Sequence, residues 1–103
     1  MSIVHLNSGN FKETVEREGV KAAVDFYADW CGPCKMFAPI FEGLSEERDD
    51  VIFAKVNVDD AEDLAVRFGV MSIPTVIIFK DGVPTSVQTG VVGKAKLSEL
   101  IDG

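Results

Sequence analysis

The stretch AAVDFYADWCGPCK, residues 22–35, contains both cysteines of this chain of 103 residues. Its first half is a nearly continuous apolar run, which is typical of a strand buried on both faces of a sheet. Cys31 and Cys34 follow, separated only by a glycine and a proline. The stretch therefore predicts a cysteine pair directly after a buried strand.

A helix is predicted to begin at the cysteine pair. The apolar residues that follow are spaced three, one and three positions apart, as on one face of a helix. They are Phe37, Ile40, Phe41 and Leu44. Pro33 is tolerated in a first helical turn, where its missing N–H would have had no partner. Ligand sites in open α/β sheets lie at the carboxyl ends of strands, so the pair is well placed for chemistry.

The rest of the chain alternates between strand and helix patterns. Asp81-Gly82 is typical of a tight hairpin turn between the last two strands. This alternation predicts an α/β sandwich in one domain, residues 1–103, with a mixed sheet and helices on both faces. The further strands are predicted at residues 3–6, 51–58, 75–79 and 83–89, and the further helices at residues 11–19, 60–69 and 94–101.

Two of these helices have candidate N-caps, because Asn, Asp and Ser side chains accept hydrogen bonds from free N–H groups at helix starts. The helix at residues 11–19 could be capped by Asn7, Ser8 or Asn10. We expect Asp59 or Asp60 to cap the helix at residues 60–69.

The composition argues against several classes of protein. Apolar residues make up 47% of the chain, as in ordinary globular domains. The net charge of −7 argues against binding to nucleic acid or to anionic membranes, since both need clustered Lys and Arg. No stretch approaches the roughly 18 apolar residues of a membrane span, and the start MSIVHLNSGN does not resemble a signal peptide. We therefore expect a cytoplasmic protein, whose thiols stay reduced unless they serve redox chemistry or bind metal.

Three interpretations of the cysteine pair are open from the residues alone. A structural disulfide would close a loop of about four residues and stabilise the fold by only roughly 2 kcal/mol. Zinc would need about four N or S ligands, and His5 is far away in sequence, although two chains could share a site. In an exchange pair, one thiol attacks a disulfide and the other then expels the bound partner. The predicted helix N-terminus favours a thiolate at Cys31, which supports the exchange pair.

Four segments, in order along essentially the whole chain, strongly resemble the thioredoxin family: AVDFYADWCGPCK, VIFAKVNVD, SIPTVIIFKDG and TGVVGKAKL. The resemblance implies a thioredoxin fold, with a central mixed sheet of about five strands flanked by about four helices on both faces. It also implies general reduction of protein disulfides by a monomer that binds no cofactor. Its implied partners are disulfide-containing target proteins and an NADPH-dependent thioredoxin reductase that recharges it.

The resemblance also implies catalytic roles. Cys31 would be the attacking nucleophile and Cys34 the resolving thiol, with Asp25 as the buried carboxylate behind them. Independently, an ionisable group in an apolar strand is costly unless it is neutral or partnered. Burial should raise the pKa of Asp25 and suit it to move protons at Cys34, although a structural, hydrogen-bonded Asp is the alternative. Lys55 matches the family's lysine near that carboxylate, and the alternative is an exposed lysine at a strand end.

Substrate binding is implied around the cysteines. Pro74 matches a cis-proline that faces the disulfide in the family. From the residues alone, an ordinary trans proline at the start of a strand is the alternative. A target segment could pair with backbone groups near Ile73, as in strand addition. Tyr27 stands where many members have tryptophan, a difference that leaves the chemistry unchanged. The substrate-binding residues implied by the resemblance are Trp30, Gly32, Pro33, Ile73, Pro74, Gly90 and Val91.

Two other functions stay open at this point. The same fold could act as an oxidant or isomerase, but the dipeptide Gly32-Pro33 and the unremarkable start of the chain point away from it. The chain could also be a binding or assembly module, with or without a metal shared between two copies, because a fold does not dictate a function.

Overall fold

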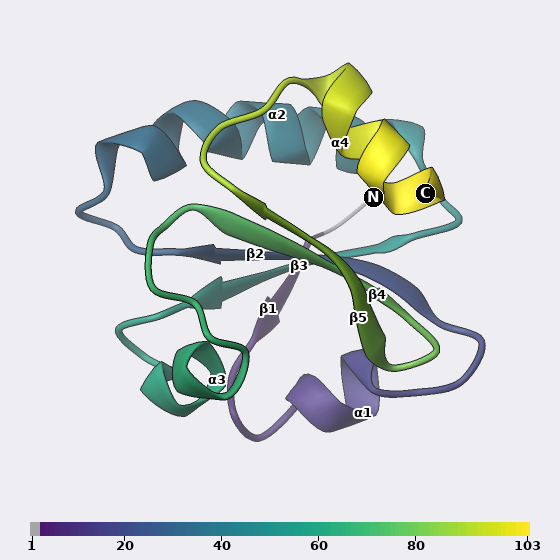
Figure 1. Cartoon of the computed structure of the whole chain (residues 1–103), viewed down its shortest axis with the longest axis horizontal. Coiled ribbons are helices and arrows are strands. Elements are labelled where there is room, and N and C mark those ends of the chain that lie inside the picture. The colour runs from purple at the N-terminus through teal and green to yellow at the C-terminus, as the bar shows by residue number, and fades with distance from the viewer. Residues whose placement is uncertain (1–2) are drawn as a thin grey trace.

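A five-stranded mixed sheet forms the centre of the molecule in a computed structural model that describes residues 3–103 (Figure 1). Its strands are β1 (Val4–Leu6), β2 (Lys21–Tyr27), β3 (Ile52–Asn57), β4 (Thr75–Lys80) and β5 (Val83–Thr89). The order across the sheet is β1-β3-β2-β4-β5. The strands β1, β3 and β2 are parallel, and β4 and β5 each run antiparallel to the preceding neighbour. The mixed sheet expected from the sequence is confirmed.

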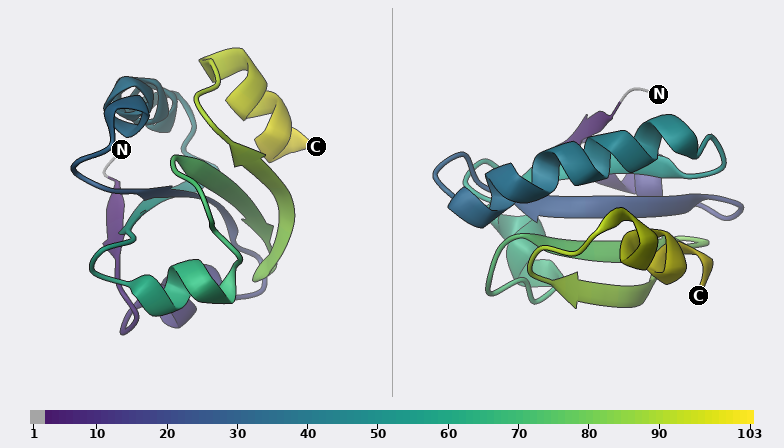
Figure 2. Two further views of the ribbon diagram at one scale, coloured as in Figure 1. Left: turned by 60° about the vertical axis from the view of Figure 1, so that its left-hand side comes forward. Right: turned by 90° about the horizontal axis from the view of Figure 1, so that it is seen from above.

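Helices cover both faces of this sheet (Figure 2). One face carries α2 (Gly32–Glu47) and α4 (Lys94–Asp102), and the other carries α1 (Phe11–Val15) and α3 (Glu62–Arg67). Because β2 lies between β3 and β4, the cysteine pair that follows it enters α2 at the middle of the sheet. The helices on both faces are as predicted.

Each face of the sheet has its own apolar core, since successive residues of a strand point to opposite faces. Val24 of β2 packs in the core under α1 and α3, which contribute Phe11 and Leu64. Its neighbour Ala23 lies in the other core, beside Phe41 of α2. The strand therefore reads as an almost unbroken apolar run because both of its sides are covered.

The hairpin predicted at Asp81-Gly82 is confirmed. Both residues have positive φ, 55° and 83° respectively, as a tight turn with matching twist requires. A Cβ added to Gly82 would lie 3.1–3.2 Å from backbone atoms of Glu16 and Arg17. Glycine is thus needed there for two reasons, the left-handed backbone and the close approach of another segment.

Of the two predicted helix caps, the position is correct at α1 and wrong at α3. Asn10 occupies the N-cap position of α1 but makes no side-chain cap, because its Oδ1 accepts a hydrogen bond from the N–H of Asn7. Its side-chain amide donates to the carbonyl oxygen of His5. The N-cap of α3 is Ala61 rather than an aspartate. Asp59 instead accepts a hydrogen bond from the Trp30 indole, 2.8 Å away.

The helix predicted to reach residue 19 also ends early, at Val15, where the backbone leaves helical angles.

Candidate active site

The cysteine pair forms the first turn of α2. Cys31 and Cys34 are joined by a disulfide, with their Cα atoms 5.2 Å apart. Cys31 is the N-cap residue, and its Sγ accepts a hydrogen bond from the N–H of Cys34 at 3.1 Å. That N–H is one of the donors that a helix start leaves without an internal partner. In the reduced protein the same donor and the helix dipole favour a negative charge on the Cys31 sulfur.

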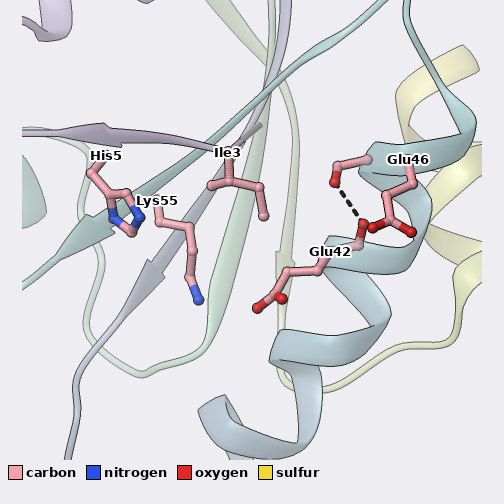
Figure 3. A pocket seen from close by; sticks show the side chains of 6 residues that line it. Ile3, His5, Glu42, Glu46 and Lys55 are labelled. Carbon is pink, nitrogen blue, oxygen red and sulfur yellow. Dashed lines mark hydrogen bonds between the residues drawn. The ribbon is translucent and has the colours of Figure 1, made fainter. Parts of the chain in front are cut away.

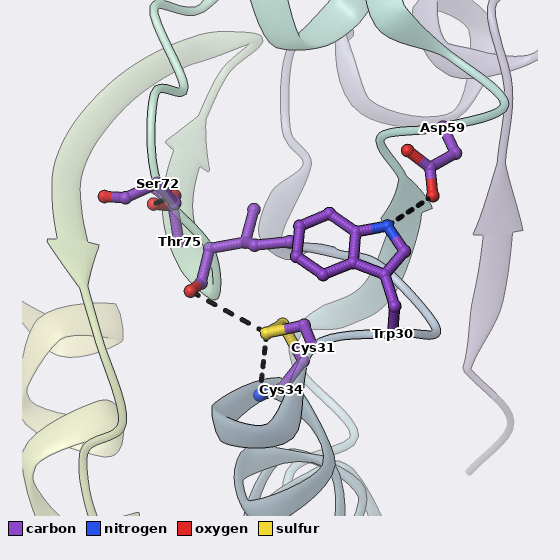
Figure 4. Close-up of a disulfide and its surroundings, with 7 residues drawn as sticks. Trp30, Cys31, Cys34, Asp59, Ser72 and Thr75 are labelled. Carbon is purple, nitrogen blue, oxygen red and sulfur yellow. Dashed lines mark hydrogen bonds between the residues drawn. A yellow bond between two sulfur atoms is a disulfide. The ribbon is translucent and has the colours of Figure 1, made fainter.

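The two sulfurs face different surroundings. Only 5% of Cys31 and 4% of Cys34 is exposed. The Sγ of Cys31 lies 3.8 Å from the carbonyl oxygen of Ile73, on the side of the loop before β4 (Figure 4). Cys34 instead lines a cavity of about 150 Å³ together with Lys55 and Tyr27. A target disulfide must therefore approach closely at the Ile73 side before it can reach a sulfur.

Asp25 lies in β2 behind the pair, on the face of the sheet that α2 covers. Its side chain is buried, and Oδ1 has no hydrogen-bond partner among residues 3–103. Burial raises the pKa of Asp25 to about 7, and the positive charge of Lys55 offsets part of this rise. The raised pKa is as expected from the sequence. The alternative, a structural Asp satisfied by a hydrogen bond, is not supported at Oδ1.

Lys55 lies beside Asp25 on the neighbouring strand, β3. It is the register partner of Asp25 in the parallel pairing of β2 and β3. The side chain is half-buried, and Nζ lies 4.5 Å from the ring centroid of Tyr27. The lysine is therefore held against a ring above the Cys34 cavity and is not a freely exposed residue at a strand end.

Apolar and backbone groups surround the exposed side of Cys31. The Ile73–Pro74 peptide bond is cis, as the resemblance implied. The carbonyl oxygen of Pro74 accepts a hydrogen bond from the N–H of Gly90 at 2.8 Å, which brings the end of β5 beside the loop before β4. Trp30 is 71% exposed and stands next to Cys31 with its indole directed to Asp59 (Figure 4).

These observations match the features of a known family over nearly the whole chain. The thioredoxin family model matches residues 2–103. A thioredoxin of Staphylococcus haemolyticus is 46% identical over 99% of this chain and 97% of its own length. One from Haemophilus influenzae is 38% identical over 97% of this chain and 94% of its own length. The crystal structure of a Malassezia sympodialis thioredoxin superposes with a TM-score of 0.89 at 35% identity, covering 98% of this chain and 89% of that one.

The chain belongs to the thioredoxin family. Thioredoxins are protein-disulfide oxidoreductases, and the disulfide of Cys31 and Cys34 is the redox-active pair expected of a member. The fold predicted from the resemblance is confirmed by the sheet order and by the structural superposition.

The structure brings the sequence-predicted site residues together in two groups. Lys55 and Cys34 line the same cavity on the α2 side of the sheet, and Asp25 is the register partner of Lys55 in the neighbouring strand. In the second group, Trp30, Gly32 and Pro33 are close to Cys31 in the chain, and the carbonyl oxygen of Ile73 lies 3.8 Å from its sulfur. Pro74 follows Ile73 and is hydrogen-bonded to Gly90, and Val91 is the exposed residue after Gly90.

Sequence reasoning missed part of the exposed apolar surface. Met71 and Val66 are 97% and 81% exposed and line a groove of about 430 Å³ with Trp30 and Ile73. Asp59, expected to cap a helix, lines the same groove. The position of Met71 two residues before Ile73 was a usable signal, but Val66 comes from α3 and is distant in sequence from the motif.

Two features of the described residues bear on the other interpretations. Within residues 3–103, no three His, Cys, Asp or Glu side chains are grouped so that they could hold a metal ion. In the same range, none of the helices has the length and apolar character needed to cross a membrane.

Proposed function

We propose that this protein reduces disulfides in target proteins through Cys31 and Cys34 and is recharged by an NADPH-dependent thioredoxin reductase. The observation that carries the proposal is the position of Cys31 as the N-cap of α2, where its sulfur accepts a hydrogen bond from the N–H of Cys34. Such a position stabilises the thiolate that starts thiol–disulfide exchange.

The reaction proceeds in two exchanges. The Cys31 thiolate attacks one sulfur of the target disulfide, a mixed disulfide forms, and the second target sulfur leaves as a thiolate. Cys34 then loses its proton and attacks the Cys31 sulfur, which releases the first target sulfur and closes the Cys31–Cys34 disulfide. Two electrons pass to the target, and the reductase returns two electrons that originate in NADPH.

Asp25 is the group proposed to accept the Cys34 proton. Its pKa of about 7 suits it to take and return a proton near neutral pH, and both residues lie on the same side of the sheet. Asp25→Asn should therefore slow release of the target from the mixed disulfide about tenfold or more at neutral pH. The measurement is the single-turnover rate per folded molecule. A normal rate in the folded fraction would refute the proton-transfer role.

Targets are proposed to dock on the face formed by Trp30, Gly32, Ile73, Pro74 and Val91. A target segment beside its own disulfide would pair with backbone groups near Ile73, as in strand addition. We further propose that the protein acts as a cytoplasmic monomer, binds no cofactor, and has no nucleic-acid or membrane partner, in keeping with its net charge of −7.

Trapping of the mixed disulfide tests the assigned roles. Cys34→Ser should accumulate a covalent adduct with a disulfide-containing protein, because the resolving thiol is absent, whereas Cys31→Ser should not. Wild-type protein, supplied with NADPH and a thioredoxin reductase, should reduce the same target catalytically. Equal trapping by both variants would contradict the roles, and the absence of turnover would contradict the function.

A further inference from the structure

The Lys55 side chain lies between two cavities. One is the cavity of about 150 Å³ that Cys34 lines, and Tyr27 forms part of its wall. The other, of about 310 Å³, lies between β1 and α2 and is lined by His5, Glu42 and Glu46 (Figure 3). Because Lys55 lines both, its ammonium group can occupy either one through rotation of its flexible stem.

Opposing attractions act on this ammonium group. On one side the ring face of Tyr27 is 4.5 Å from Nζ, a distance at which the ring attracts a cation. On the other side Glu42 and Glu46, one helical turn apart on α2, line the larger cavity, and the Glu42 side chain extends from the helix on the side of Lys55 (Figure 3). Within residues 3–103, no ion pair or hydrogen bond joins Lys55 to either glutamate. The observed position is thus the one at the ring.

We propose that Tyr27 is a positioning residue that holds the Lys55 ammonium beside Asp25 and Cys34, against the attraction of Glu42 and Glu46. The inference rests on the proposed proton transfer through Asp25 and adds a specific means of adjusting it. Tyr27 and Asp25 are two residues apart in β2, so their side chains lie on the same face, where Lys55 meets both.

The position of the lysine matters because its charge acts on Asp25. Burial raises the pKa of Asp25, and the charge of Lys55 lowers it. Movement of the ammonium into the larger cavity weakens the second effect, so the pKa of Asp25 rises further. The other charged or titratable side chains that line the two cavities around Lys55 are His5 of β1, Asp29 after β2, and Lys35, Glu42 and Glu46 of α2.

The test is the pH dependence of target release from the mixed disulfide, measured in single turnovers. Tyr27→Leu removes the ring and should move the midpoint upward by about half a pH unit, whereas Tyr27→Phe keeps a ring and should stay near wild type. Equal shifts in the two variants would overturn the proposal, since they would implicate the hydroxyl group. No shift in Tyr27→Leu would overturn it as well.

Substitution of a glutamate in the larger cavity should shift the pH midpoint of target release in the opposite direction. Glu42→Gln weakens the competing attraction, so the midpoint should move downward. Both shifts should disappear in a Lys55→Met background, because a double-mutant cycle isolates effects that act through the lysine. Shifts of unchanged size in that background would contradict the proposal. Glu47→Gln is the matched control, since Glu47 pairs with Lys94 instead.

Failure of this inference is distinguishable from failure of the proposed function. Each variant is first combined with Cys34→Ser and tested for formation of the mixed disulfide. If Cys34→Ser forms no mixed disulfide even without a second substitution, the proposed function fails. If adducts form normally and only the predicted shifts are missing, the function stands and the role of Tyr27 is refuted. The midpoint is independent of the amount of folded protein, so reduced stability of Tyr27→Leu does not obscure the result.

Discussion

Asp25 combines a buried position with an oxygen that has no hydrogen-bond partner among residues 3–103. An ionised carboxylate is costly in such a place, which is the reason its pKa rises from 3.8 to about 7. The sequence predicted this residue and its titration behaviour, because Asp25 interrupts an apolar strand. The resemblance also placed Lys55 near this carboxylate, but the residues alone left an exposed lysine open, because its position depends on the register between β2 and β3.

At the residue scale, the stability of the oxidised protein should depend on Asp25 between pH 4 and pH 7. Above the ordinary carboxyl pKa the unfolded chain releases the proton that the folded protein keeps. The stabilisation is therefore complete at low pH and is lost as the pH rises through about 7. The loss is on the order of 4 kcal/mol, from about three pKa units.

Urea unfolding of wild type and Asp25→Asn across this pH range measures the effect. The difference between the two free energies of unfolding should grow in favour of Asp25→Asn as the pH rises, since asparagine does not ionise. A difference that is constant with pH would contradict the raised pKa.

At the scale of elements, apolar periodicity predicted the strands and helices of both faces, because burial and local geometry act together there. The caps were not predictable in this way. Asp59 and Asn10 have the right chemistry for caps, but their side chains form hydrogen bonds with Trp30 and His5 instead. These contacts depend on the folded structure and not on a local pattern. The hairpin was predictable, because its positive φ angles restrict which residues can form it.

Gly82 offers a test of the hairpin. Gly82→Ala should destabilise the fold by roughly 1–3 kcal/mol, because alanine is strained at a φ of 83° and its Cβ would press on the backbone of Glu16. Gly93→Ala is a matched control, since its φ is −77° and no atom lies within 4 Å of the added carbon. Thermal or urea unfolding gives both values, and equal losses would contradict the explanation.

At the scale of the whole molecule, three exposed apolar residues from separate segments gather on one side of the nearly covered disulfide. Trp30 follows β2, Val66 belongs to α3, and Met71 precedes β4, yet all three line one groove. The family resemblance predicted Trp30 and Ile73 near the cysteines. The contribution of α3 followed only from the tertiary arrangement, because no local pattern connects Val66 with the cysteine motif.

This arrangement predicts that docking and chemistry can be separated. Trp30→Ala should raise the KM for a protein disulfide several-fold, because an anchoring aromatic side chain typically contributes about 1–2 kcal/mol or more. The rate at which a small dithiol reduces the Cys31–Cys34 disulfide of this variant should be nearly unchanged. Val83→Ala removes an exposed side chain at the opposite end of the sheet and should affect neither. A similar KM for the Trp30 variant and wild type would argue against this docking face.

The most direct measurement is the pH dependence of alkylation of each sulfur in the reduced protein, resolved by peptide mass analysis. If the start of α2 stabilises negative charge on Cys31, that residue should react first, with a midpoint about one pH unit or more below that of a free cysteine. Cys34 should react far more slowly at neutral pH. Preferential labelling of Cys34, or a Cys31 midpoint equal to that of free cysteine, would contradict the account.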